Sequence, residues 1–424
     1  MPPATFIHRL DNGIRLATVS MPHMASVSVG LWTDAGSRHE TGREHGMAHF
    51  VEHMLFKGTP TRSASDISRH IESLGASIDG FTVEDHTAYQ VKGPAERFAK
   101  LFDVLADLYR SPSLDPREIE FEKQVIHEEI AMVRDQPSQY LEDLISEAVW
   151  GPEHPLGRSI TGTDQSLDAF KRSDVFDFHQ RAYSGCNTVI SVAGNIDHDE
   201  VLDVISKRFG DLPKGNPISF IPAGTIRESH RFHEDEGQEQ SHLALSFRNV
   251  HRYDETRFAQ KLLNVILGEN MSSRLFQTIR EQKGLCYEIQ SDVVSFSDAG
   301  LLQIYLALSP GNLRKALAGI SDILDDLREN GVSDEELEEA KAFLIGQNRI
   351  SLENTSSQMM WAGETLLFFN EWIDPEEIHR KIEEVTSADI RQAARRAFEE
   401  NTRCTALIGP PSSLEVLDGW LRSC

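Results

Sequence analysis

Five consecutive residues, His49-Phe50-Val51-Glu52-His53, bring two imidazoles and one carboxylate close together in the sequence. In a helix of about 3.6 residues per turn, His49 and His53 would share one face, with Glu52 beside them. Two neutral imidazoles can bind a zinc ion, and a neighbouring carboxylate can act as a base. The alternative interpretation is a solvated amphipathic helix whose polar residues are incidental.

A third zinc ligand is expected, because a catalytic zinc usually has three protein ligands and one open position. The best candidates lie on a helix predicted over residues 115–134, which begins with an Asp-Pro pair. Its apolar residues are expected on one broad arc: Ile119, Phe121, Val125, Ile126, Ile130, Met132 and Val133. Glu122 and Glu129 fall in the middle of this arc, and Glu128 lies at its edge.

Carboxylates that face an apolar interior need a cationic partner. Zinc would be such a partner, so Glu129 is predicted as the third ligand. Glu122 is then predicted to orient a ligand histidine without contacting the metal itself. Buried salt bridges with arginines are the alternative explanation for both carboxylates.

Composition narrows the class of protein. The chain has 424 residues, enough for two or three domains, and its net charge of −25 argues against nucleic-acid binding. Its four cysteines lack C-x-x-C spacing, which favours reduced thiols. We expect a cytoplasmic protein without a membrane span, or one of the mitochondrial matrix if a presequence was removed.

The order of predicted elements indicates two homologous α+β halves. A tight hairpin is expected at residues 10–14, and further strands at 26–32, 80–91 and 188–193. Helices are expected at 63–75, 95–110, 115–134, 138–150, 173–183 and 198–208. An Arg-Ala-aromatic triplet at 181–183 recurs about 215 residues later, at 396–398, and each copy precedes a strand.

The predicted domains are an N-terminal metal-binding domain (1–211), a linker rich in turn residues (212–225) and a C-terminal homologous domain (226–424). Residues 259–268 fall where the motif helix would recur, but they contain no histidine. Only the first half is therefore expected to hold a metal.

Taken together, these features resemble the pitrilysin and insulin-degrading enzyme family of zinc peptidases, the inverzincins. The chain shares the inverted H-x-x-E-H motif, Glu129 lying 76 positions after His53, and Glu122 seven before Glu129. The segments 75–89, 154–157 and 193–197 are also similar to that family. The resemblance implies two domains, each a mostly antiparallel sheet flanked by helices, and one zinc ion per chain.

The resemblance also implies roles for residues outside the motif. Arg280 and Tyr287 match the family's second-half pair, which contacts the substrate and the oxyanion. The stretch Asp79, Gly80, Phe81 and Thr82 matches the strand that binds peptide by edge addition. The family usually has Asn-Ala where this chain has Asp79-Gly80, and the added charge would favour a basic substrate residue.

In its length, this chain resembles the members of one family branch, which contains the mitochondrial processing peptidase β-subunit and its bacterial relatives. In that branch two chains close around a chamber, so a homodimer is expected, with a heterodimer with a degenerate homologue as the alternative. The implied activity is zinc-dependent endopeptidase cleavage of unstructured peptides, with Glu52 as the base that activates water. A non-catalytic assembly subunit and a zinc hydrolase of small amides are the rival interpretations.

Overall fold

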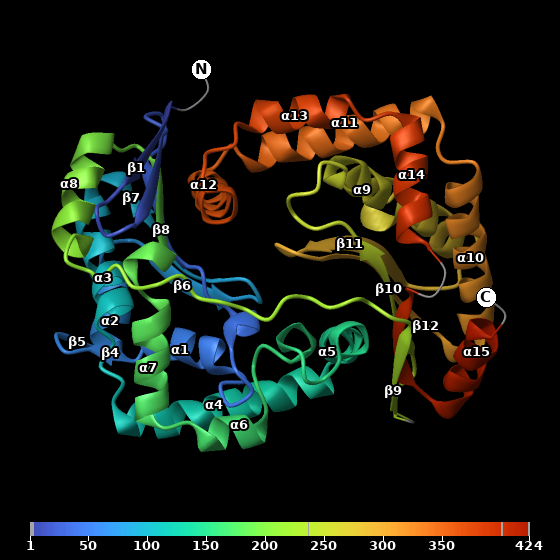
Figure 1. The fold of residues 1–424 in the computed structure, drawn as a ribbon, viewed down its shortest axis with the longest axis horizontal. Helices are drawn as coiled ribbons and strands as arrows, with labels where there is room; N and C mark the ends of the chain where they lie inside the picture. The colour runs from blue at the N-terminus through green and yellow to red at the C-terminus, as the bar shows by residue number, and fades with distance from the viewer. Residues whose placement is uncertain (1–3, 236, 400–401, 423–424) are drawn as a thin grey trace. The chain divides into compact units, whose positions relative to one another are not determined.

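A computed structural model describes residues 4–235, 237–399 and 402–422. The chain forms two compact units, each assembled from three separate segments (Figure 1). The first unit contains residues 1–131, 159–221 and 349–373, and the second contains 132–158, 222–348 and 374–424.

The first unit is built on a six-stranded sheet with the order β1-β2-β8-β3-β7-β6. All neighbouring strands are antiparallel except the parallel pair β2–β8. The strands are β1 (Ala4–Arg9), β2 (Arg15–Ser20), β3 (Ser26–Thr33), β6 (Ser77–Thr82), β7 (Thr87–Pro94) and β8 (Thr188–Gly194). The predicted hairpin at residues 10–14 joins β1 to β2, with Gly13 at a φ of 94°.

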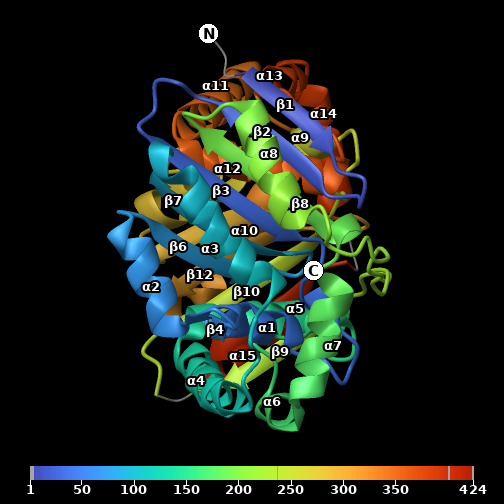
Figure 2. The ribbon, with the colours of Figure 1, turned by 90° about the vertical axis from the view of Figure 1, so that its left-hand side faces the viewer.

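Both faces of this sheet are apolar, because successive side chains along a strand point to opposite sides. Leu16 and Leu31 face α3 (Phe98–Arg110) and α8 (His198–Phe209), which cross the sheet in Figure 2. Ala17 and Trp32 face α12 (Thr355–Phe369). The unit also contains β4 (Gly58–Thr59), β5 (Arg62–Ser63), α1 (Met47–Leu55), α2 (Ala64–Ser73), α6 (Asp164–Ala169), α7 (Arg172–Ala182) and most of α4 (Pro116–Asp135), which continues into the second unit after residue 131.

The second unit repeats this topology with five strands in the order β11-β12-β10-β13-β9. The series β2-β8-β3-β7-β6 corresponds to β9-β13-β10-β12-β11, and in each series only the first pair is parallel. The strands are β9 (Ser229–Glu234), β10 (Ser241–Asn249), β11 (Glu288–Ser295), β12 (Gly300–Leu308) and β13 (Cys404–Gly409). The prediction of two homologous α+β halves is confirmed.

Helices also cover both faces of the second sheet. One apolar face packs against α9 (Arg257–Asn264), α10 (Leu313–Glu329), α14 (Ser387–Ala397) and α15 (Pro411–Leu421). The other face packs against α5 (Pro137–Trp150). The remaining helices are α13 (Pro375–Glu383) and α11 (Asp334–Ser351), which continues into the first unit after residue 348. Two π-helical segments span Val265–Glu269 and Phe276–Gln282.

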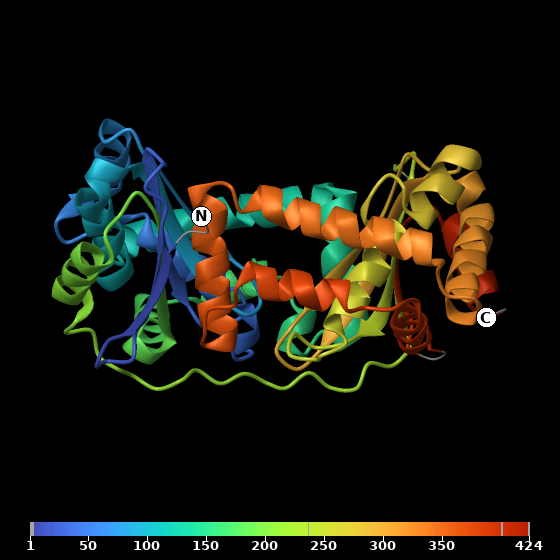
Figure 3. The ribbon, with the colours of Figure 1, turned by 90° about the horizontal axis from the view of Figure 1, so that it is seen from above.

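The two units exchange helices, which the predicted linear boundaries do not describe. Helix α5 precedes residue 211 but packs in the second unit, whereas α12 follows residue 226 but packs in the first. Each sheet has a second apolar face, and a helix from the other half of the sequence covers it. The predicted linker is an extended segment without helix or strand over residues 213–228 (Figure 3).

One predicted strand is wrong in its extent. The single strand expected over residues 80–91 is two antiparallel strands, β6 and β7, joined by a turn at 83–86. The Val83 N–H donates to the His86 carbonyl at 2.9 Å and closes the turn. The acidic pair between these two residues suits a tight turn better than a strand.

Cys186, Cys286 and Cys404 have free thiols, as predicted, and Cys424 lies outside the described residues. Among the helices of the described ranges, none is both long enough and apolar enough to cross a bilayer.

A buried histidine in the first unit predicts that the fold loses stability in acid. His179 is 3% exposed, and its Nε2 lies 2.9 Å from the Tyr109 carbonyl oxygen. Burial lowers the pKa of His179 from 6.5 to about 4. The unfolded chain therefore binds this proton more readily, and stability is lost as the pH falls from about 6.5 towards 4. From pH 7 to pH 5 the loss should be about 2 kcal/mol.

Urea unfolding of the wild type and of His179→Gln at both pH values measures this contribution. Glutamine can still donate to the Tyr109 carbonyl but does not titrate, so its variant should lose less stability between pH 7 and pH 5. Equal losses in the two proteins would contradict the assignment.

Candidate metal centre

The motif helix α1 is buried almost all the way round, and among its residues only His53 is partly exposed. Gly46 precedes the helix at a φ of 88°. Glu40 accepts hydrogen bonds from the backbone N–H groups of Gly46 (2.8 Å) and Ala48 (2.7 Å). This buried carboxylate accepts hydrogen bonds from amides at the N-terminus of the helix. Its negative charge is stabilised there by the positive end of the helix dipole. The sequence prediction missed this cap.

Helix α4 supplies the carboxylates, although its buried face is narrower than predicted. Ile119, Glu122, Ile126 and Ile130 are buried. Three residues assigned to the same arc are instead exposed large hydrophobics: Phe121 (58%), Val125 (37%) and Met132 (50%). The predicted arc was too wide because it combined two faces of the helix. The two neighbouring glutamates differ in burial as predicted, since Glu129 is half-buried and Glu128 is exposed.

The structure brings the three predicted ligands together. His49 Nε2 and His53 Nε2 are 3.2 Å apart. Glu129 Oε1 is 3.6 Å from His49 Nε2, and Glu129 Oε2 is 3.7 Å from His53 Nε2. Zinc binds imidazole nitrogen at about 2.0–2.1 Å, so two such ligands at a tetrahedral angle lie roughly 3.4 Å apart. The observed spacing fits one metal ion between the three side chains.

The electrostatics of the site also favour a cation. Burial, helped by the neighbouring His53, lowers the pKa of His49 to about 3, so its imidazole is neutral and can donate a lone pair. Burial opposes a charge on His53, but its hydrogen bond to Glu122 and the surrounding carboxylates raise the pKa of His53 overall. Burial raises the pKa of Glu129. Negative charge in a buried site is stabilised by a positive ion.

Glu122 contacts His53 at Nδ1, the ring nitrogen that does not face His49 and Glu129, as predicted for an orienting residue. Its Oε1 lies 2.8 Å from His53 Nδ1, and its Oε2 lies 2.6 Å from Lys57 Nζ. Burial favours the neutral acid, but the hydrogen bonds from His53 and Lys57 outweigh it and lower the pKa of Glu122. His53 therefore keeps its proton on Nδ1 and leaves Nε2 free for the metal. Within the described residues, His49 Nδ1 has no such partner.

Glu52 points towards the edge strand of the first sheet. The Thr82 hydroxyl donates to Glu52 Oε2 at 2.9 Å. A Cβ at Gly80 would lie 3.2 Å from Glu52 Oε1 and 3.0 Å from Phe56 Cε2, so glycine leaves room for both side chains. Burial raises the pKa of Glu52, and the Thr82 hydrogen bond opposes that rise. Such a carboxylate is poised to take up a proton.

Asp79 and Phe81, the other two residues of the predicted substrate strand, alternate with Gly80 and Thr82 along β6. Their side chains therefore lie on the opposite face of the sheet from Glu52. The Asp79 carboxylate accepts from the Gly80 N–H at 3.0 Å. Phe81 packs edge-on against Trp32, with ring centroids 6.1 Å apart. Strand β6 pairs only with β7, so its other edge has no neighbouring strand within the described part of the chain. Their predicted contact with substrate stays a prediction.

Arg280 and Tyr287 belong to the second unit. The Arg280 guanidinium lies 4.5 Å from the Phe276 ring centroid and 5.5 Å from that of Tyr287. Tyr287 is 78% exposed. The pair is therefore assembled and accessible in its own unit, and its role towards the metal site stays a prediction.

The second unit has a polar contact that parallels the one between Glu52 and Thr82. Ser291, on edge strand β11, donates to Asn264 Oδ1 at 2.7 Å, and Asn264 ends helix α9. An amide here cannot serve as a base. Across the described ranges, the one cluster of three side chains that could hold a metal ion is that of His49, His53 and Glu129.

Comparisons with known proteins agree with this two-unit arrangement. Residues 15–164 match the family model described as Insulinase (Peptidase family M16), and residues 169–344 match the Peptidase M16 inactive domain. A protease from Helicobacter pylori has the same fold, with a TM-score of 0.89 at 21% identity, covering 97% of this chain and 100% of that one. The peptidase M16 inactive domain from Pseudomonas fluorescens gives 0.88 at 20% identity, covering 96% and 98%.

Relatives of higher identity define the family. The chain is 35% identical over 410 residues to the uncharacterized zinc protease YmxG of Bacillus subtilis, covering 95% of this chain and 98% of the relative. It is 34% identical over 418 residues to an uncharacterized zinc protease of Mycobacterium tuberculosis, covering 98% and 95%. The chain belongs to peptidase family M16, the insulinase family, which confirms the resemblance to pitrilysin-type peptidases.

The geometry predicts that Glu129, and not its neighbour, binds the metal. Glu129→Gln should lose more zinc affinity than the roughly 10- to 100-fold typical of outer-shell substitutions. Glu128→Gln removes the same charge one residue away on an exposed position and should bind zinc like the wild type. Zinc content after dialysis against a weak chelator distinguishes them, and full occupancy in Glu129→Gln would exclude Glu129 as a ligand.

Proposed function

We propose that this chain is a zinc-dependent metalloendopeptidase that hydrolyses unstructured peptides. The main support is one observation: ligand atoms of His49, His53 and Glu129 lie within 4.8 Å of one another. Helix α1, which carries both histidines, also carries Glu52, whose carboxylate is held by Thr82 at an unpaired sheet edge. A metal site, a base and a peptide-binding edge thus adjoin within one unit.

Each residue has a defined task in this proposal. A zinc ion, when bound, would polarise the scissile carbonyl and acidify the attacking water. Glu52 accepts the proton of that water on a carboxylate oxygen and then delivers it to the leaving amine. Thr82 fixes the carboxylate so that its other oxygen, Oε1, remains available. Glu122 holds His53 with Nε2 towards the metal site.

The free edge of β6 suits substrates in extended conformation. A peptide that adds to this edge is bound through its backbone, so many sequences are accepted. The Asp79 carboxylate, which accepts from the Gly80 N–H, must give way when a substrate carbonyl takes that hydrogen bond. Its negative charge then favours a basic residue nearby.

We further propose that Arg280 and Tyr287 stabilise the oxyanion or the peptide backbone within a closed chamber. A homodimer would enclose such a chamber, with a heterodimer with a degenerate homologue as the alternative. The acidic chain is not expected to bind nucleic acid. A cytoplasmic location stays a prediction.

A second candidate function is that of a non-catalytic subunit that depends on a partner. One observation favours it: residues 169–344 match a family model named for an inactive domain. That match covers a region without the metal ligands, whereas all three ligands lie in residues 15–164, which match the insulinase model. Catalysis by the isolated chain separates the two candidates.

The proposed base is tested by Glu52→Gln. This variant keeps the shape and the metal ligands but cannot take a proton, so zinc content should persist while peptide cleavage falls about 10²–10⁴-fold. Hydrolysis of a fluorogenic peptide library, with and without chelator, provides the rate. Glu128→Gln serves as the matched control on an exposed glutamate. Cleavage by Glu52→Gln at the wild-type rate would reject the assignment, and chelator-resistant cleavage would reject a metal mechanism.

The proposed assembly is tested by its mass in solution. Light scattering on the purified chain alone should give twice the mass of one chain if the protein is a homodimer. A monomer that cleaves peptides would contradict the need for a second copy. A monomer that gains activity only with a cell fraction would favour the heterodimer.

A further inference from the structure

Lys57 lies where the end of helix α1 meets helix α4, which carries Glu122. It lies two residues after the end of α1, and its Nζ lies 2.6 Å from Glu122 Oε2. The other oxygen of the same carboxylate lies 2.8 Å from His53 Nδ1. Glu122 is thus shared between an ammonium group on one side and a predicted metal ligand on the other.

The ion pair between Lys57 and Glu122 differs from a surface salt bridge, because the Glu122 carboxylate is buried. The Glu122 side chain is 2% exposed, whereas Lys57 is 25% exposed and reaches solvent. A buried carboxylate must keep both its oxygens satisfied. Without the ammonium group, Glu122 Oε2 would have no cationic partner. The carboxylate would then be more stable if it turned towards another hydrogen-bond donor. His53 Nδ1 would then lose the acceptor that fixes its ring.

The backbone around Lys57 is fixed on both sides. The Lys57 N–H donates to the Met54 carbonyl at 3.2 Å. The next residue, Gly58, accepts through its carbonyl from the Ser113 N–H at 2.9 Å, shortly before α4 begins. The end of α1 is therefore tied to the loop that leads into α4, and Lys57 spans the same junction with its side chain.

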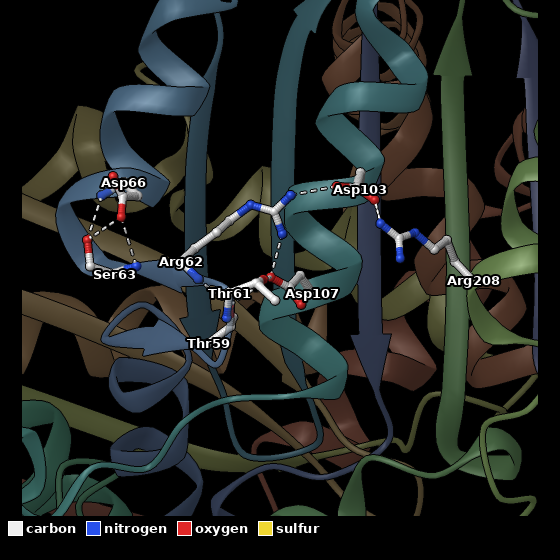
Figure 4. Close-up of polar contacts among 8 residues, drawn as sticks. All are labelled: Thr59, Thr61, Arg62, Ser63, Asp66, Asp103, Asp107 and Arg208. Atoms are coloured by element: carbon white, nitrogen blue, oxygen red, sulfur yellow. Dashed lines mark hydrogen bonds and ion pairs between the residues drawn. The ribbon is translucent and has the colours of Figure 1, made fainter.

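A polar network holds the hairpin that follows Lys57 (Figure 4). The hydroxyls of Thr59 and Thr61 donate to Asp107 Oδ2 at 2.7 and 2.9 Å. Arg62 forms ion pairs with Asp107 and Asp103 on helix α3. The hairpin β4–β5 is thereby fixed to α3, so the Lys57 backbone has little freedom to move away from Glu122.

We propose that Lys57 is a positioning residue of the metal site, which acts on His53 through Glu122. The proposal rests on the metal site of the proposed function. Lys57 holds the Glu122 carboxylate in place, Glu122 holds the proton on His53 Nδ1, and His53 Nε2 then points towards His49 and Glu129. The lysine itself contacts neither metal nor substrate.

Zinc affinity, measured by competition with a fluorescent chelator, tests this role without any activity assay. Lys57→Met removes the ammonium group and should weaken zinc binding about 10- to 100-fold. Lys57→Arg restores the positive charge and should bind zinc nearly as the wild type does. In a Glu122→Gln background, Lys57→Met should have almost no additional effect, because both changes remove the same support.

Lys123→Met is a matched control, because Lys123 lies next to Glu122 but pairs with Glu120 at 2.9 Å. It should leave zinc affinity unchanged, since it removes the same charge without touching the Glu122 carboxylate. If Lys57→Met does not fold, as judged by circular dichroism, Lys57→Gln replaces it in both backgrounds.

Two results would overturn the inference. One is wild-type zinc affinity in Lys57→Met, and the other is an equal loss of affinity with and without Glu122. Failure of the wild type to bind zinc would instead reject the metal site itself, so the two failures are distinguishable.

Discussion

The local structure of the first unit depends on the burial of carboxylates beside two histidines. Glu52 and Glu122 are buried and Glu129 is half-buried, all next to His49 and His53. Desolvation alone would favour their neutral forms. The protein meets this cost with one ammonium group from Lys57, with the Thr82 hydroxyl, and with a gap between ligand atoms that fits a metal ion. The arrangement is best explained if a cation completes it.

The scaffold holds α1 and α4 in the orientation that this cluster requires. Glu40 caps the start of α1 through two backbone amides, and the hairpin fixed by Arg62 follows its end. The sheet behind them is covered on both faces, one of them by α12 from late in the sequence. A site whose ligands come from two helices gains precision when the helix that carries two of them is fixed at both ends. The duplicated second unit keeps the sheet but has Asn264 in a contact that resembles that of Glu52.

Much of the site could be predicted from the sequence, because its ligands obey short-range rules. The four-residue spacing of His49 and His53 needs only a helix, and helical geometry distinguished Glu129 from Glu128. Long-range contacts could not be predicted. Glu40 caps α1 from outside any helical pattern, and the pairing of Lys57 with Glu122 joins residues 65 positions apart in the chain. Phe121 was assigned to the core because apolar character alone does not tell which of two adjacent helix faces is buried. The exchange of α5 and α12 was missed for a similar reason: an amphipathic pattern does not identify the sheet that it covers.

Binding of one zinc ion by His49, His53 and Glu129 is tested most directly by X-ray absorption at the zinc edge of the loaded protein. We expect one zinc per chain, with two imidazole nitrogens at about 2.0–2.1 Å and carboxylate or water oxygens at about 2.0–2.2 Å completing the coordination shell. A spectrum without imidazole scattering, or one dominated by sulfur at about 2.3 Å, would contradict this expectation.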